Sequence, residues 1–415
     1  MKERSIHLFY RLQRFTRTDL RYLAKGGSWS SLSYVMQVGF GIITTVALAN
    51  LLPKEILGTY QFIIAMSGII GIFTLTGMGT AIIRAVAQGH EGAFRNGVQV
   101  KLKWSVGVAV AGATFATYYA YNGNTDLAIS FLIIAACVPL IDTFLLYESY
   151  LRGKQAFRDE VMLGLWRKPL PLIALLGALY FTDHVPTLIA AYFATTVIST
   201  ILVYAKIIQK YQPPDTPHEE TVAYSKQISV MGILSRIAEH ADKALLWYLL
   251  GPVAVATFTI AQLATRYSGG LANVISHISL PKVSQRDLPT LQETLPRKVW
   301  IFTVIMIPLM LGYVFVVPFL FQFLFPEYLE SIPLAQTLGI LFLFLPRSVY
   351  GYALVAHKQT RALYILSITI PLIKLGAMAS LILFFGIWGA VYALILTEAI
   401  NLFITWYLFR IARAT

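Results

Sequence analysis

The sequence predicts an all-α polytopic membrane protein of about twelve transmembrane helices, arranged as two six-helix bundles with both termini in the cytoplasm. The chain has 415 residues, of which 57% are hydrophobic and 13% charged. A soluble domain carries about 25% charged residues. The mean hydropathy is +0.66. The apolar runs are continuous rather than alternating, so a transmembrane β-barrel is excluded.

Twelve segments are long and apolar enough to cross a bilayer, since about 20 such residues span the hydrocarbon core as a helix. They are 28–52, 60–83, 104–121, 127–147, 163–182, 187–208, 228–250, 255–278, 299–325, 333–356, 361–385 and 388–409. Residues 1–27 form a basic cytoplasmic N-terminal segment without the apolar core of a signal peptide. An amphipathic surface helix and a basic tail are both compatible with it.

The net charge of +13 reflects membrane topology rather than nucleic-acid binding. With the N-terminus in the cytoplasm, 27 of the 33 lysines and arginines fall in cytoplasmic segments or at helix ends beside them. The outer loops together hold one, Lys54. Cytoplasmic loops of membrane proteins are enriched in this way, so both termini are expected inside and no nucleic-acid partner is expected.

The chain contains an internal repeat. Residues 51–60 (LLPKEILGTY) join spans 1 and 2, and residues 249–258 (LLGPVAVATF) join spans 7 and 8 at an offset of 198 residues. A Lys-Gln pair follows span 4 at Lys154 and span 10 at Lys358. An even number of spans inserts both halves in the same orientation, as in parallel-repeat transporters.

The repeat divides the chain into two lobes joined by a linker. The N-terminal six-helix lobe is 28–208, the cytoplasmic linker is 209–227 and the C-terminal six-helix lobe is 228–409. The linker is polar and proline-rich, which suits a tether that lets one lobe move against the other.

Five basic side chains fall within the predicted spans of the second lobe. They are Arg236, Lys243, Arg266, Arg347 and Lys374. A cation at mid-membrane costs roughly 2.5–3.5 kcal/mol on insertion scales, so these residues are expected to face a hydrated or counter-charged interior. Because corresponding positions of spans 1 and 2 carry no charge, the two lobes are expected to share a fold but not a chemistry.

Nearby acidic groups leave two interpretations of this interior. Arg236 can pair with Glu239, Lys243 with Asp242, and one further cation with Glu398, while Asp142 of span 4 can reach across. Five cations still outnumber these carboxylates, so at least one is expected to meet an anionic substrate, with Arg266 and Arg347 the leading contacts.

Four titratable residues are candidates for coupling to a proton or another cation. They are Glu239, His240, Glu398 and Asp142. Prolines 139, 171, 308, 318, 346 and 371 are expected to interrupt spans and line a cavity, with simple helix curvature as the alternative.

Motifs of enzymes and of metal or nucleotide sites are missing. Gly153-Lys154 lacks the glycine spacing and the Ser or Thr of a P-loop, and no HExxH or Ser-His-Asp arrangement occurs in a loop. The single cysteine, Cys137, lies in span 4 and is expected to be a packing residue. No enzyme activity, cofactor or metal is therefore predicted.

Several loose motifs resemble the polysaccharide-transporter and O-antigen (Wzx-type) flippase family of the multidrug/oligosaccharidyl-lipid/polysaccharide superfamily. They are GSW at 27–29, ALANLLP at 47–53, LGTY at 57–60, GMGTAIIR at 77–84, LRGKQAF at 151–157, and ADKALL at 241–246 before LGP at 250–252. The likeness covers approximately residues 20–410. It implies a two-lobed, V-shaped, twelve-helix transporter.

The resemblance also implies a function. Such proteins translocate polyprenyl-diphosphate-linked oligosaccharides from the inner to the outer leaflet of the cell inner (plasma) membrane by alternating access. The implied partners are this lipid-linked substrate, membrane lipids and other polysaccharide-assembly proteins. The alternatives are a cation-coupled multidrug exporter, an exporter of another lipid precursor, or a membrane polymerase or glycosyltransferase, for which the outer loops are too short.

Overall fold

The computed structural model describes residues 20–267 and 287–412, and every regular element in these ranges is helical. The first half contains α2 (Leu20–Leu51), α3 (Lys54–Ile70), η1 (Gly71–Thr74), α4 (Met78–Ala87), α5 (Ala93–Trp104), α6 (Val106–Tyr121), α7 (Thr125–Phe144), α8 (Leu146–Gly153), α9 (Phe157–Arg167), α10 (Pro169–Phe181) and α11 (Val185–Tyr211). The second half contains α12 (Glu219–Leu250), α13 (Pro252–Ala261), α14 (Leu263–Arg266), α16 (Leu288–Leu324), η2 (Pro326–Ser331), α17 (Ile332–Leu338), η3 (Gly339–Arg347), α18 (Ser348–Ala356), α19 (Thr360–Phe385) and α20 (Ile387–Ile411). The chain is an all-helical, multi-span membrane protein.

Within the described ranges, nine helical segments are long and apolar enough to cross a membrane. The three other predicted spans, 104–121, 228–250 and 255–278, do not correspond to a helix that is both long and apolar enough, each for a different reason. A break at Ser105 leaves α6 with 16 residues, and α12 carries charged residues along its length. The part of predicted span 255–278 beyond Tyr267 lies outside the described residues.

Helix breaks do not coincide with most of the prolines expected to cause them. Pro139, Pro308, Pro318 and Pro371 lie inside continuous helices, where a missing N–H bends a helix without ending it. Pro346 lies in the 3₁₀ segment η3. The break between η1 and α4 instead occurs at Leu75, whose φ of 54° is left-handed.

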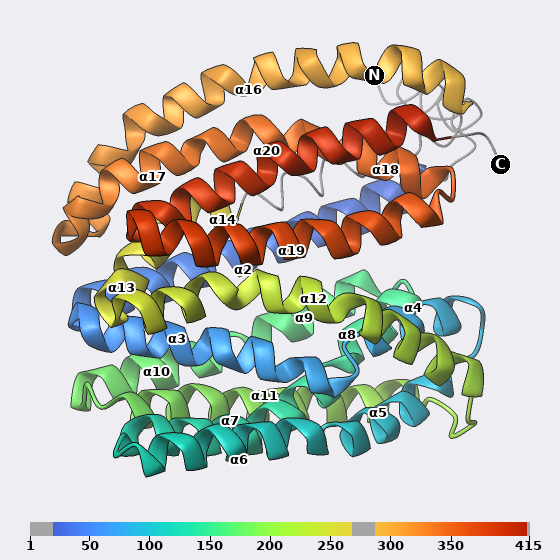
Figure 1. The fold of residues 1–415 in the computed structure, drawn as a ribbon. Helices are drawn as coiled ribbons and strands as arrows, with labels where there is room; N and C mark the ends of the chain where they lie inside the picture. The colour runs from blue at the N-terminus through green and yellow to red at the C-terminus, as the bar shows by residue number, and fades with distance from the viewer. Residues whose placement is uncertain (1–19, 268–286, 413–415) are drawn as a thin grey trace, which may run out of the picture.

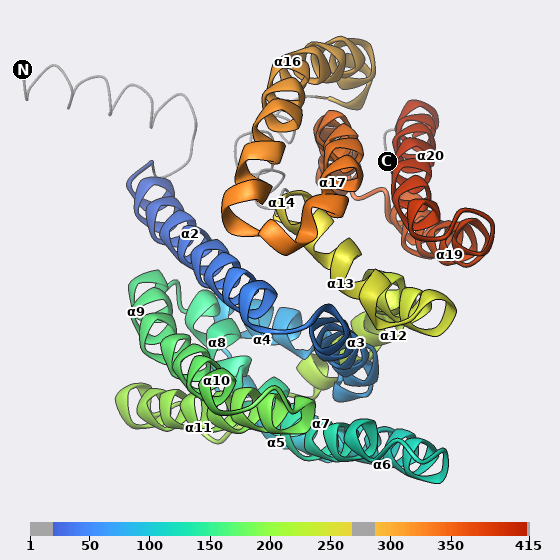
Figure 2. The same cartoon turned by 90° about the vertical axis from the view of Figure 1, so that its left-hand side faces the viewer.

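The two halves of the chain lie one above the other in Figure 1, with α12 and α13 of the second half beside α3 of the first. Figure 2, an end-on view, shows α3, α12 and α13 together where the halves meet. The helix α12 also packs against α4 and α19, so it contacts both halves along its length. Gly68 of α3 makes part of this approach possible, because a Cβ there would clash with the ring of His240.

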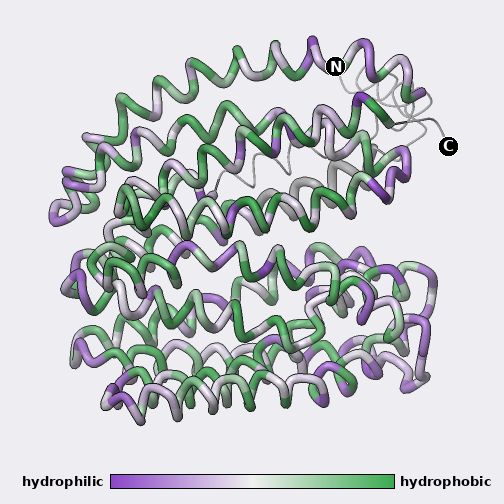
Figure 3. The backbone as a smooth tube through the Cα atoms, viewed as in Figure 1, coloured by the Kyte–Doolittle hydropathy of each residue, from purple (hydrophilic) through white to green (hydrophobic). Residues whose placement is uncertain are grey.

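The largest hydrophobic core is shared by the two halves. It joins Leu57 and Phe62 of α3 to Leu246 of α12 and Phe258 of α13, all fully buried. Two smaller cores lie within the first and second halves respectively. Apolar residues follow the middles of the helices, and hydrophilic residues gather toward their ends (Figure 3).

The turns after α8 and α18, where the sequence carries the Lys-Gln pairs, have the same geometry. Gln155 and Lys358 both adopt left-handed φ, 58° and 52°. In each turn the following residue donates its N–H to the carbonyl five positions earlier, which is the hydrogen bond of a Schellman cap. The equivalent residues are therefore Gln155 and Lys358, so the Lys-Gln echo of the sequence is displaced by one position.

Candidate functional site

A polar cavity of about 250 Å³ lies between the two halves, enclosed by α3, η1, α7, α11 and α12. Ser67, Thr76, Tyr192 and Thr196 contribute polar atoms to its wall. Its charged lining residues are Asp142 of α7 and Arg236 of α12. Two predicted site residues that are almost 100 positions apart in the sequence are thus brought to one cavity.

The carboxylate of Asp142 is held by the segment that breaks the second span. The Thr74 hydroxyl in η1 donates to Asp142 Oδ2 at 3.0 Å. Thr74 is itself fully buried, because η1 turns the chain inward before α4 begins. The break in this span therefore fixes a carboxylate that lines the cavity.

A lysine that lies outside the predicted spans belongs to the same region. Lys101 of α5 is 6% exposed, and its charged neighbours are Asp142 and Arg236. Lys103, two positions later, is exposed. Both lysines lie on α5, a separate helix that ends where the predicted span 104–121 begins, and only Lys101 is buried. The interior positive charge is therefore not confined to the second half, contrary to the expectation.

The buried Lys243 contacts an uncharged partner from the other half. Its Nζ donates to Gln61 Oε1 of α3 at 2.9 Å. The expected ion pair with Asp242 is absent: Asp242 accepts the backbone N–H of Lys243 at 2.9 Å and a long contact from Gln262 at 3.5 Å. Arg266 of α14 is the other charged group that acts on Lys243, and it is also a cation.

The charged residues of predicted span 7 differ in exposure along α12. Arg236 and Glu239 are exposed, Asp242 and Lys243 are buried, and His240 is half-buried against Gly68. The expected Arg236–Glu239 ion pair does not form in the described part of the chain. Arg236 and Glu239 therefore do not neutralise each other through a direct ion pair.

Arg347 and Glu398 form the one ion pair found among the nine predicted site residues within the described ranges. Arg347 Nε donates to Glu398 Oε2 at 2.7 Å, and a terminal guanidinium nitrogen contacts the same oxygen. With its amide oxygen turned toward the guanidinium, Asn401 accepts from Arg347 Nη1 at 2.7 Å. Arg347 is therefore the cation that pairs with Glu398, a pairing for which the sequence did not identify the basic partner.

Lys374 of α19 lies apart from these groups. It is half-buried and has no ion-pair partner in the part of the chain that the structure describes. A further cluster unforeseen from the sequence lies in the first half, where Arg167 contacts Glu148 at 3.2 Å and Arg152 contacts Glu160 at 2.7 Å. Because Arg167 falls within the predicted span 163–182, the sequence did contain a clue to this cluster, namely a basic residue inside a membrane segment.

Solved structures of transporters share this fold. An inward-facing multidrug-resistance MATE transporter of the MOP superfamily matches with a TM-score of 0.71 and 14% identity, over 89% of this chain and 93% of that one. An outward-facing MATE transporter matches with a TM-score of 0.62 and 16% identity, over 92% and 93%. A MOP-superfamily transporter from Pyrococcus furiosus Vc1, whose binding pocket is described as having reverse polarity that suggests a different function, matches with a TM-score of 0.65 and 16% identity over the same shares.

Sequence comparison identifies the family. None of the curated proteins matches this sequence. The model of the family described as polysaccharide biosynthesis protein matches residues 23–286, which is more than half of the chain. The chain therefore belongs to the polysaccharide biosynthesis protein family, and its fold is that of MOP-superfamily transporters.

Proposed function

We propose that the protein is a flippase that moves a polyprenyl-diphosphate-linked oligosaccharide from the inner to the outer leaflet. The observation that carries this proposal is the excess of basic over acidic groups among the predicted site residues, Asp242 and Lys101, with Lys101 and Lys243 buried. Six basic groups, including Lys101, accompany four carboxylates, and Lys243 contacts an amide instead of a carboxylate. Family membership supplies the link to polysaccharide biosynthesis.

In this proposal the diphosphate is bound where the halves meet. Arg236, Lys243 and Arg266 are assigned to the diphosphate, together with Lys101. An arginine fork offers two parallel hydrogen bonds to phosphate oxygens, whereas a lysine acts as a point charge. Arg347 and Lys374 are assigned to later steps along the path, since both lie on elements of the second half away from the polar cavity.

The proposed ion-coupling groups are Glu239, His240, Asp142 and Glu398. Asp142 is the leading one, because it combines an exposed cavity surface with two nearby cations whose fields change when an anion binds. A substrate phosphate that engages Arg236 would weaken the hold of that cation on Asp142. We therefore propose that the coupling ion binds at Asp142 when the substrate phosphate engages Arg236.

The proposed topology has twelve spans in two six-helix bundles, with lobes 28–208 and 228–409 and both termini in the cytoplasm. The similarity in fold to MATE transporters over 89% or more of the chain supports this arrangement. The membrane is proposed to be the inner (plasma) membrane. No enzymatic step is proposed, and other polysaccharide-assembly proteins are the proposed partners.

Alternating access is proposed as the mechanism. In this topology the end with the α2–α3 and η2–α17 junctions faces outward, and contacts between the halves join it. Across the two halves, Lys54 Nζ lies 2.9 Å from Glu330 Oε1 and Asn50 donates to the Leu324 carbonyl at 2.8 Å. Thr257, from the same half as Glu330, donates to the same carboxylate oxygen at 3.2 Å. These contacts favour a state closed to the outside.

A multidrug exporter is the second candidate, because Asp142 and Tyr192 in one cavity could hold an organic cation. The neighbouring Arg236 and Lys101 oppose such a ligand. The decisive experiment reconstitutes the protein in liposomes that contain a polyprenyl-diphosphate-linked oligosaccharide and measures the sugar that becomes accessible to a glycosidase on the far side. Efflux of ethidium from the same liposomes, with no transfer of the lipid-linked sugar, would favour the drug exporter.

A further inference from the structure

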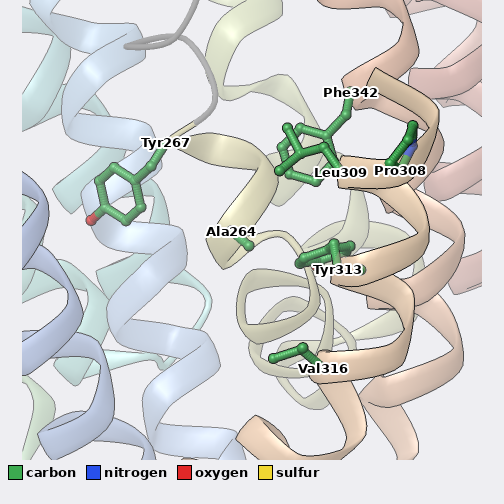
Figure 4. Close-up of a pocket in the computed structure, with 8 residues that line it drawn as sticks. Ala264, Tyr267, Pro308, Leu309, Tyr313, Val316 and Phe342 are labelled. Carbon is green, nitrogen blue, oxygen red and sulfur yellow. The ribbon is translucent and has the colours of Figure 1, made fainter. Parts of the chain in front are cut away.

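A second, apolar cavity of about 500 Å³ lies in the second half between α14, α16 and η3 (Figure 4). Ala264, Leu309, Gly312, Tyr313 and Phe342 line it, and none of its lining residues is charged. Ligand sites in proteins have volumes of about 300–1,000 Å³. We call this space the tail cavity. Its size and lining suit an apolar ligand.

One end of the tail cavity adjoins a cation of the candidate site. Tyr267 lines the cavity, and the residue before it is Arg266, whose side chain is exposed and forms no ion pair within the described ranges. Arg266 acts electrostatically on Tyr192, which lines the polar cavity between the halves. An anion at Arg266 would therefore lie between the polar and the apolar cavities.

The opposite side of α16 carries the apolar surface of a lipid-facing helix. Leu311 and Phe315, which do not line the cavity, are 57% and 72% exposed, on the same turns that supply Gly312 and Tyr313 to it. In a membrane protein such a surface contacts acyl chains. A hydrocarbon chain in the cavity would therefore lie beside a lipid-facing surface of the same helix.

Tyr267 also connects the tail cavity to the first half of the chain. Its carbonyl accepts a hydrogen bond from the Tyr34 hydroxyl of α2, and its ring approaches Gly41 so closely that a Cβ there would clash with the phenol oxygen. Figure 4 shows Tyr267 directed toward α2, away from the side chains of α16 and η3. The cavity thus lies at the border where the halves would separate.

We propose that the tail cavity binds the isoprenoid chain of the lipid-linked substrate while Arg266 contacts its phosphate. This inference rests on the proposed function, because it assigns the second chemical part of the same substrate. The apolar chain accounts for an uncharged cavity, and the phosphate accounts for an exposed cation at its end. A phospholipid acyl chain is the competing occupant that the experiment must exclude.

Gly312 offers a substitution that fills the cavity without disturbing the helix. A Cβ at Gly312 would meet no atom within 4 Å, and the residue lines the cavity. Gly177 of α10 is a matched control, since its Cβ would also meet no atom within 4 Å. Both positions are inside helices, so Leu raises helix propensity at either one by a similar amount, ~1 kcal/mol.

The probe is a photoactivatable polyprenyl phosphate, compared with geranyl phosphate and with polyprenol, which has the chain but no phosphate. In nanodiscs of defined phospholipid, adducts of the long-chain probe are expected on residues 308–316 and 342. Gly312→Leu should weaken long-chain binding roughly tenfold, which corresponds to the loss of about two buried methylene groups at ~0.8 kcal/mol each. It should leave geranyl phosphate unchanged, and Gly177→Leu should bind like the wild type.

Arg266→Gln separates the two parts of the ligand. It should weaken polyprenyl phosphate binding while leaving polyprenol unaffected. Equal weakening of long and short phosphates by Gly312→Leu would overturn the inference. Competition of the adducts by bilayer phospholipid as effectively as by unlabelled polyprenyl phosphate would also overturn it, and would assign the cavity to an acyl chain.

Translocation in the same nanodisc preparation, transferred to liposomes, tests the proposed function separately. If the wild type transfers the lipid-linked sugar but the adducts lie elsewhere, the tail cavity is wrong and the flippase proposal stands. If the adducts fall on α16 and η3 but no transfer occurs, the cavity binds polyprenyl chains and the flippase proposal fails.

Discussion

The Nζ atom of Lys243 lies 2.9 Å from the side-chain oxygen of Gln61, so a buried cation of the second half is bound to a neutral amide of the first. Lys243 is 7% exposed and Gln61 8% exposed. A hydrogen bond to a charged group contributes about 1.5–3 kcal/mol. This contact therefore joins the two halves through a partner that carries no counter-charge, and under the proposed function that charge binds the substrate anion.

Substitutions of Gln61 should separate the stabilising effect of this hydrogen bond from the role of the Lys243 charge in transport. Gln61→Leu leaves the ammonium without its partner, so we expect a loss of about 1–3 kcal/mol in unfolding free energy, seen as a lower Tm in detergent. Gln61→Glu supplies a counter-charge and should keep Tm at or above the wild-type value while reducing translocation. Gln88→Leu, at an exposed position, is the control. Wild-type transport by Gln61→Glu would remove Lys243 from the substrate path.

Lys101 and Lys103 form a matched pair on one helix. Lys101 is buried beside Asp142 and Arg236, whereas Lys103 is exposed. Lys101→Met should reduce translocation at least roughly tenfold, because a charged hydrogen bond to phosphate is worth about 1.5–3 kcal/mol. Lys103→Met should retain activity at equal membrane abundance. Equal activity of the two variants would exclude Lys101 from the site.

The sequence predicts the membrane class and, within the described ranges, nine of the twelve spans that it proposes, because both depend on local apolar composition. It also places Asp142 and Arg236 at membrane depth, but their meeting depends on how α7 and α12 pack. Lys101 was missed because it lies on α5, outside the predicted spans, and hydropathy alone does not reveal which of two nearby lysines turns inward. The pairing of Lys243 with Gln61 was also missed, since charge counting considers only carboxylates as partners.

Lys54 is not an inert surface residue, although the sequence leaves it as the single outer-loop cation. Its salt bridge to Glu330 joins the two halves at 2.9 Å. The pair is partly exposed, so we expect a coupling energy of no more than about 1 kcal/mol in a double-mutant cycle. Lys54→Glu and Glu330→Lys should each shift the conformational equilibrium, measured by cysteine accessibility, and the double reversal should restore it. Lack of restoration would show that the pair does not hold the halves together.

Glu91 provides a pH-dependent contact in the turn between α4 and α5. The Lys154 ammonium donates to it at 2.8 Å and lowers the pKa of the carboxyl below its usual 4.5. A lowered pKa gives stability that is present above the unfolded value and is lost as pH falls through the folded one. Acidification below about pH 4.5 should therefore lower Tm more in the wild type than in Glu91→Gln. Identical pH profiles would show that the contact does not contribute to stability.

Arg347 and Arg266 should respond differently to substitution, because Arg347 has a carboxylate partner. Arg347→Gln leaves Glu398 unpaired at a position where the two side chains are 25% and 29% exposed. We expect a loss of about 1–2 kcal/mol, below the 3–5 kcal/mol of a fully buried pair. The double variant Arg347→Gln, Glu398→Gln should recover most of that stability, because it leaves two neutral amides. Arg266→Gln should lower translocation without lowering Tm, since no ion pair is broken within the described ranges.

If the double variant of Arg347 and Glu398 also recovers transport, Arg347 is a structural partner of Glu398. If transport stays lost although Tm recovers, its guanidinium contacts the substrate.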